Sequence, residues 1–295
     1  MLWFSLSALS ATAKAANQAA TKTLTSTYSV LAIAAFGQLA AGISVFPLIL
    51  VPGLVAIPGD LDFHRAAFVT ISLNIAAILL LVEAIRGSEL SYALPFLGLT
   101  PVFTILTAWV LRGEVIGLVG VLGILLVFLG TMSIDAGSLP DWAKLGGRRI
   151  FRDRGVRLVV CVALIYSISS VYDKSATLLS DPYTFVWYSA VIRAVALLLL
   201  FFGRRRLWGI DNSVTTVRPA HILLFAFLGV TFIAEALFQM GALQTGPVAF
   251  VIAIKRLSIL FTSLAGVLVF KEAFSLARLS GAVLIVAGVT IIYLS

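Results

Sequence analysis

Long uninterrupted runs of apolar residues, separated by short polar links, occupy most of the chain. Runs of about 20 apolar residues are long enough to cross a lipid bilayer as helices, and continuous rather than alternating apolarity favours helices over membrane strands. The runs predict ten helices near residues 2–20, 28–51, 66–86, 91–111, 115–134, 156–173, 183–202, 221–244, 247–270 and 276–294. The first run is the most polar, so we expect it to face protein or a water-filled cavity.

The last two predicted helices repeat an earlier stretch of the chain at a constant spacing of 158 residues. The matched pairs include Glu114 with Glu272, Gly123 with Gly281 and Gly130 with Gly288. Further matches extend the repeat back through both halves, with five predicted helices in each. Because five is odd, the second half enters the membrane from the side opposite to the first. Two inverted halves are typical of secondary transporters, whose substrate site lies between them near the midplane.

A basic linker separates the two predicted halves, and it contains several helix-breaking Gly and Pro residues followed by a cluster of arginines. The predicted divisions are residues 1–134 for the first five-helix repeat, 135–155 for the linker and 156–295 for the second repeat. The predicted fold class is therefore an all-α polytopic membrane protein with about ten transmembrane helices in two inverted five-helix repeats.

Composition agrees with a membrane protein. Of the 295 residues, 61% are hydrophobic and 12% are charged, against roughly 25% charged residues in soluble domains. The net charge of +8 comes from basic residues in the links between apolar runs, where they set membrane orientation rather than bind nucleic acid. Most of the 21 lysines and arginines fall on the face of the central linker, which predicts a cytoplasmic linker and external termini. We expect a multi-pass protein of the cytoplasmic (inner) cell membrane.

Several of these features together resemble the drug/metabolite transporter (DMT) superfamily, and specifically its EamA-type members. They are ten spans in two inverted halves, a Gly-Glu or Lys-Glu link before the last helix of each half, and the Gly-x6-Gly spacing that follows. The stretch from Leu243 to Glu272 is similar to the family's second-half signature. The resemblance covers essentially the whole chain and implies a transporter. Family members export amino acids, nucleotides, sugars and drugs, and usually have both termini in the cytoplasm, opposite to the orientation that the charges predict.

Charged residues at membrane depth are the main candidates for a substrate site, because each costs about 2.5–3.5 kcal/mol on insertion scales and normally faces a cavity or a partner. Glu235 lies deep in the run at 221–244, and Lys255 and Arg256 lie near the middle of the run at 247–270. Neighbours on a helix point about 100° apart, so we expect one of these cations to pair with Glu235 and the other to meet substrate. The candidate substrate-binding residues are Lys14, Gln38, Asn74, Tyr92, Thr100, Lys174, Arg193, Glu235, Gln239, Lys255, Arg256 and Ser258.

Other features have structural interpretations that compete with functional ones. Glu114 and Glu272 should begin the last helix of each half and interact with its dipole. The repeated glycines should bring helices close together, within the chain or between protomers. Pro95 and Pro101 predict a bend in the fourth helix, either a gate or a static kink. The buried charges themselves can be structural ion pairs or snorkelling side chains.

The excess of deep cations favours an anionic or zwitterionic metabolite, moved by alternating access. A lipid or lipid-linked-sugar flippase is the alternative, and a purely structural membrane protein would not need buried charge. The chain lacks a His-x3-His pair, an acidic cluster and a Gly-x-Ser-x-Gly turn, and it has a single cysteine, so we expect no enzyme, no metal and no cofactor. Glu235 is the deepest carboxylate for proton coupling, although facilitated diffusion is equally tenable. The expected partners are a small-molecule substrate, the lipid bilayer and, as an open alternative, a second protomer.

Overall fold

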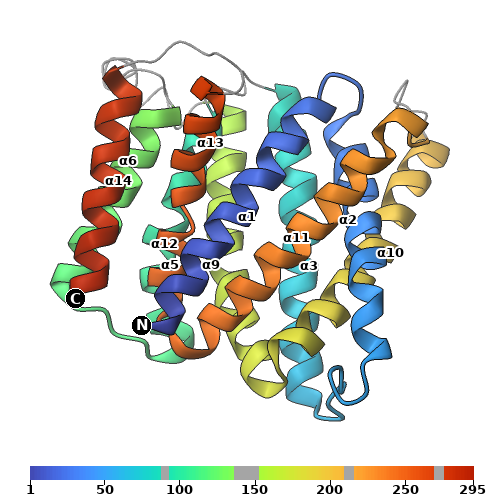
Figure 1. Ribbon diagram of the computed structural model, residues 1–295, viewed down its shortest axis with the longest axis horizontal. Helices are drawn as coiled ribbons and strands as arrows, with labels where there is room; N and C mark the ends of the chain where they lie inside the picture. The colour runs from blue at the N-terminus through green and yellow to red at the C-terminus, as the bar shows by residue number, and fades with distance from the viewer. Residues whose placement is uncertain (88–92, 136–152, 209–215, 269–275) are drawn as a thin grey trace.

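The computed structural model describes residues 1–87, 93–135, 153–208, 216–268 and 276–295, and every regular element in these ranges is helical (Figure 1). The first half contains α1 (Leu2–Leu24), α2 (Val30–Val45), η1 (Phe46–Leu50), α3 (Leu61–Gly87), η2 (Leu94–Leu99), α5 (Thr100–Arg112) and α6 (Leu118–Asp135). The second half contains α9 (Arg154–Leu179), α10 (Pro182–Trp208), η3 (Pro219–His221), α11 (Ile222–Thr245), α12 (Val248–Ile254), α13 (Leu257–Leu268) and α14 (Leu276–Leu294).

The helices are those of an all-α polytopic membrane protein. In the described ranges, six spans are long and apolar enough to cross a membrane, and two shorter apolar helices come at 118–134 and 278–294. The polar helix α1 is not among these eight, and it packs along α11. Ser10 Oγ donates to the backbone oxygen of Glu235 at 3.0 Å, and Asn17 Nδ2 donates to that of Leu228 at 3.0 Å. The polar side of α1 therefore faces protein, as its composition predicts.

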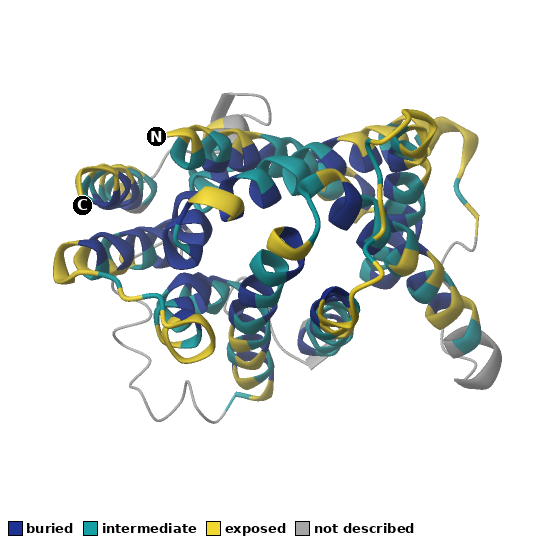
Figure 2. Ribbon diagram, turned by 90° about the horizontal axis from the view of Figure 1, so that it is seen from below, coloured by how far each residue is buried: buried dark blue, intermediate teal, exposed yellow. Residues whose placement is uncertain are grey.

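The two halves are interleaved rather than set side by side. Helix α1 of the first half packs on α11 of the second, while α9 of the second half packs on α3 of the first. Helices α2 and α10 pack together at one end of the molecule, and α6 and α14 pack together at the other (Figure 1). Figure 2 shows the helices from below, on the side of the molecule where both termini lie. Each major interface thus joins one helix from each half.

Four glycines bring α6 and α14 together. A Cβ atom on Gly130 would lie 2.6 Å from the carbonyl oxygen of Gly281, and one on Gly288 would lie 2.6 Å from that of Gly123. Contacts this close require residues without side chains. These four glycines therefore pack within one chain, and the alternative that they join two protomers does not hold for them.

Both of the predicted helices at 91–111 and 247–270 are interrupted. The first divides into the 3₁₀ helix η2 and helix α5, with Pro95 and Pro101 near their starts. The second divides into α12 and α13 at Lys255 and Arg256, although no proline lies there. The expectation of one continuous helix at 247–270 is therefore wrong. Interrupted helices near the midplane are a common feature of secondary transporters, because they expose backbone groups to a cavity.

Glu114 does not begin the helix that follows it, which starts at Leu118. Its carboxylate instead accepts a hydrogen bond from the backbone N–H of Val248 at 2.9 Å and from Lys174 Nζ at 2.6 Å. The expected favourable contact with a helix N-terminus exists, but the helix is α12 of the other half. Glu272, the repeat partner of Glu114, lies outside the described residues.

Candidate functional site

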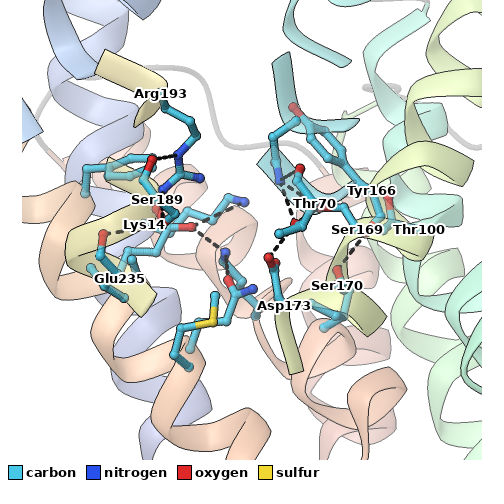
Figure 3. A pocket seen from close by; sticks show the side chains of 18 of the residues that line it. Lys14, Thr70, Thr100, Tyr166, Ser169, Ser170, Asp173, Ser189, Arg193 and Glu235 are labelled. Carbon is cyan, nitrogen blue, oxygen red and sulfur yellow. Dashed lines mark hydrogen bonds and ion pairs between the residues drawn. The ribbon is translucent and has the colours of Figure 1, made fainter. Parts of the chain in front are cut away.

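A cavity of about 380 Å³ lies between the two halves. Its walls are formed by side chains from the interruption after α12 and from the helices α1, α3, η2, α5, α9, α10, α11 and α12. Its charged lining residues are Lys14, Asp173, Arg193, Glu235, Lys255 and Arg256. Figure 3 shows Lys14, Arg193 and Glu235 toward one side of the view, and Thr70, Ser169 and Asp173 toward the other. The site is therefore polar and is built from both halves.

Glu235 is the centre of an ion-pair cluster. Its Oε1 atom lies 2.5 Å from Lys255 Nζ and 3.8 Å from Lys14 Nζ. Gln239 lies one helical turn after Glu235, and its side-chain oxygen also accepts a hydrogen bond from Lys255. The pairing of Glu235 with one of the two neighbouring cations is thus present, and Lys255 is that cation. Glu235 thus has two cationic partners, and a role for it in proton coupling stays a prediction.

Arg256 connects the two helix interruptions. Its Nη2 atom donates to the carbonyl oxygen of Leu97 at 2.6 Å, and the hydroxyl of Thr100 donates to the same oxygen at 2.7 Å. Leu97 lies in η2, and its oxygen also accepts the backbone N–H of Thr100 at the end of that helix. Lys255 and Arg256 both line the cavity. They bind different partners, Glu235 for Lys255 and Leu97 for Arg256, as the expectation that they point apart requires. A contact of Arg256 with substrate stays a prediction.

A carboxylate that the sequence analysis missed, Asp173, lies on the wall formed by α9. Thr70 Oγ1 donates to Asp173 Oδ1 at 2.6 Å. The hydroxyls of Thr70 and Ser169 lie 2.7 Å apart, and Asn74 Nδ2 donates to Ser169 Oγ at 2.7 Å. This polar network joins α3 of the first half to α9 of the second.

Arg193, on α10, is held by neutral groups. Its Nε atom donates to the backbone oxygen of Ser189 at 3.2 Å, and its Nη2 atom donates to Ser189 Oγ at 3.3 Å. The guanidinium carbon lies 5.2 Å from the ring centre of Phe232, within the range of a cation–π contact. Within the described ranges, no carboxylate lies within 4 Å of this guanidinium. In the part of the chain that the structure describes, Arg193 is therefore a cavity cation without an ion pair.

The comparisons with known proteins agree with this architecture. The profile of the EamA-like transporter family matches residues 1–134 and 153–294. The chain belongs to the EamA-like transporter family. A solved structure titled "Crystal structure of protein" has 16% sequence identity and a TM-score of 0.76, and the match covers 99% of this chain and 96% of that one. At this identity the likeness shows the fold alone. The comparison with curated proteins finds no match.

Eight of the twelve candidate residues line the cavity of this EamA-like transporter: Lys14, Asn74, Thr100, Arg193, Glu235, Gln239, Lys255 and Arg256. Lys174 instead binds Glu114 and donates to the backbone oxygen of Gly246 at 2.9 Å. Gln38 and Ser258 are buried and do not line the cavity. Tyr92 lies outside the described residues. A substrate-binding role for the eight stays a prediction.

The polar residues of the first predicted helix predict that it faces protein or a cavity, and Asn17 and Gln18 on it do line the cavity. The polar lining residues that sequence reasoning missed are Thr70, Tyr166, Ser169, Ser170, Asp173 and Ser189. Four of them, Tyr166, Ser169, Ser170 and Asp173, recur at three- and four-residue intervals, which places them on one face of α9. That stripe was a readable signal. The predicted helix at 156–173 contains the whole stripe, but it placed Asp173 at its end, whereas α9 continues to Leu179. Among the described residues, no group of three His, Cys, Asp or Glu side chains is placed to hold a metal ion.

Proposed function

We propose that this EamA-like transporter moves a small metabolite with an anionic group across the cytoplasmic (inner) membrane. The observation that supports this substrate class is the charge of the cavity. Of its charged lining residues, Lys14, Arg193, Lys255 and Arg256 are cations, whereas Asp173 and Glu235 are acids. Lys14 and Lys255 already pair with Glu235, so Arg193 is the cation best placed to bind an anionic group. An arginine offers several N–H donors in a fixed geometry that suits carboxylate and phosphate.

Alternating access is the transport mechanism that fits this arrangement. The cavity lies between two interleaved halves, and the interruptions at η2–α5 and α12–α13 offer points at which each half can bend. The contacts of Glu114 with Lys174 and Val248 join α12 and α9 to the link between α5 and α6. These charged contacts join the halves and involve few groups, so they suit an interface that forms and breaks during transport.

The first experiment tests the substrate class. The melting temperature of the purified protein would be measured with a panel of amino acids, nucleotides, sugar phosphates and lipid phosphates, because a ligand that binds only the native state raises it. At about 100 times its Kd, a ligand contributes roughly 2.7 kcal/mol. This corresponds to about 5 °C if each kcal/mol shifts the melting temperature by roughly 2 °C. We expect such shifts only from compounds with an anionic group.

Arg193→Gln should abolish the shift, and Arg65→Gln is the matched control. Arg65 is 68% exposed and pairs with Asp62 at 3.2 Å, away from the cavity, so its loss should leave ligand binding unchanged. Equal stabilisation of wild type and Arg193→Gln would contradict the assignment of Arg193. A shift from lipid phosphates alone would favour the flippase alternative, which a lipid-translocation assay in proteoliposomes would then test.

A further inference from the structure

Asp173 is a carboxylate at the end of a chain of hydrogen-bond donors. The amide nitrogen of Asn74 can only donate, and it donates to Ser169 Oγ at 2.7 Å. Ser169 and Thr70 lie 2.7 Å apart, and Thr70 donates to Asp173 Oδ1 at 2.6 Å. Because the chain starts at a donor and ends at a carboxylate, its hydroxyl protons point toward Asp173. This arrangement supplies Asp173 with a neutral hydrogen-bond donor and no positive charge.

The two carboxylates of the cavity, Glu235 and Asp173, therefore differ in their ion-pair partners. Glu235 has Lys255 at 2.5 Å and Lys14 at 3.8 Å. In the part of the chain that the structure describes, no cationic side chain lies within 4 Å of the Asp173 carboxylate. Two cations on other cavity walls, Arg193 and Lys255, make their described contacts with Ser189 and with Glu235 instead. A charge at membrane depth is expensive unless it meets a partner, so Asp173 is suited to a cation that arrives with the substrate.

Arg193 presents the complementary situation, because its guanidinium meets Ser189 and Phe232 but no described carboxylate within 4 Å. Figure 3 places Arg193 and Asp173 in separate parts of the same cavity. A molecule with an anionic end and an ammonium end would give each residue its missing partner. A volume of about 380 Å³ lies within the range of small-molecule sites, roughly 300–1,000 Å³.

We propose that Asp173 binds the ammonium group of a zwitterionic substrate whose anionic group is bound by Arg193. This inference rests on the proposed function and narrows its substrate class from anions in general to zwitterions. The hydrogen bonds through Thr70, Ser169 and Asn74 position the Asp173 carboxylate. The other cavity acid, Glu235, already forms ion pairs with Lys255 and Lys14. Asp173 is then the residue that distinguishes a zwitterion from an anion of similar shape.

The test uses pairs of ligands that share an anionic group and differ in the amino group. Three pairs of different length cover the unknown separation of the two charges: phenylalanine and phenyllactate, 4-aminobutyrate and butyrate, and phosphoethanolamine and ethyl phosphate. Affinities would be measured by calorimetry or thermal shift on the full-length purified protein. In at least one pair, we expect wild type to prefer the ammonium-bearing member by about 10- to 100-fold, the range for a hydrogen bond to a charged group.

Asp173→Asn should bring this preference close to one while the anionic member still binds. The amide oxygen of asparagine can accept the Thr70 hydrogen bond, so the fold should be retained. Asp181→Asn is the matched control, because Asp181 accepts from the backbone N–H groups of Tyr183 and Thr184 at the start of α10, outside the cavity. Asparagine serves this capping role equally well. If Asp173→Asn fails to fold, Asp173→Glu displaces the charge by one methylene and should change the preference in the affected pair.

The possible results separate this inference from the proposed function. Weakening of both pair members to the same extent by Asp173→Asn would overturn the ammonium site and favour a proton site or a structural role. A wild-type protein that binds the anions without preferring ammonium in any pair would overturn the inference and leave the proposed function standing. Binding of neither member of any pair, with no shift from the wider anion panel, would overturn both.

Discussion

The ion-pair cluster at Glu235 makes a quantitative prediction about stability. Coulomb's law with an effective dielectric constant of about 20 gives roughly 6–7 kcal/mol of attraction for two charges at the 2.5 Å that separates Glu235 and Lys255. Desolvation of both groups offsets much of this, and the loss of one partner from a buried pair typically costs about 3–5 kcal/mol. The Glu235 and Lys255 side chains remain 13% and 15% exposed. We therefore expect the lower end, about 3 kcal/mol, for Glu235→Gln.

A double-mutant cycle isolates the pairwise part of this cost. Glu235→Gln leaves the ammonium groups of Lys14 and Lys255 without their shared carboxylate, whereas Lys255→Met leaves Glu235 with Lys14 alone. At roughly 2 °C per kcal/mol, Glu235→Gln should lower the melting temperature by about 6 °C, and Lys255→Met should lower it by less. The double variant removes both charges, so it should lose clearly less than the sum of the single variants.

The assay is thermal unfolding of the detergent-purified variants, together with substrate uptake by cells that express them at measured surface levels. Both single variants should reduce uptake while surface expression stays near that of wild type. Additivity of the two melting-temperature changes to within about 1 °C would show that the two charges are not coupled and would refute the reasoning. Full transport activity in both variants would likewise contradict a role for the cluster at the site.

Two further predictions concern the contacts that hold the halves together. Glu114→Gln should lower the melting temperature by about 2–6 °C, because its ion pair with Lys174 is mostly buried. The same change at Glu83, which belongs to an exposed pair, should have almost no effect. Equal effects would show that the Glu114 contact does not help to hold the halves together. Gly130→Val should prevent normal packing of α6 on α14, because its Cβ would lie 2.6 Å from a backbone oxygen. Gly117→Val is the control, because a Cβ there meets no atom within 4 Å. If Gly130→Val matched wild type in gel filtration and thermal unfolding, the packing argument would be refuted.

The helices could be predicted from the sequence because a lipid bilayer excludes most other backbone conformations. Every backbone polar group in lipid must be satisfied locally, so a run of about 20 apolar residues has few options other than a helix. The same rule predicted one continuous helix at 247–270, so it did not predict the interruption at Lys255 and Arg256. No proline marks that position, and the backbone departs from the helix where side-chain and cavity contacts can satisfy the freed groups. Such an interruption depends on neighbours from the other half, which a pattern along one segment cannot supply.

The candidate site was predictable only in part, for a related reason. A deep charge is visible in sequence, and Glu235, Lys255 and Arg193 were found by depth alone. Depth depends on where each helix ends, however. An end placed at residue 173 rather than Leu179 puts Asp173 at the membrane surface, where a carboxylate needs no explanation. The same residue inside α9 needs a partner.

The repeat itself separates residues that support the fold from residues that select the substrate. Positions that match between the halves, such as Gly130 and Gly288, pack helices against each other. At the same spacing of 158 residues, Glu235 matches an alanine and Lys255 matches a leucine. Lys14 has a lysine counterpart in Lys174, yet Lys14 lines the cavity while Lys174 binds Glu114. Two similar halves can exchange roles during transport only if their packing is equivalent, whereas a ligand without internal symmetry needs an asymmetric set of charges. The unmatched charges of the cavity are therefore where differences in substrate between related transporters should arise.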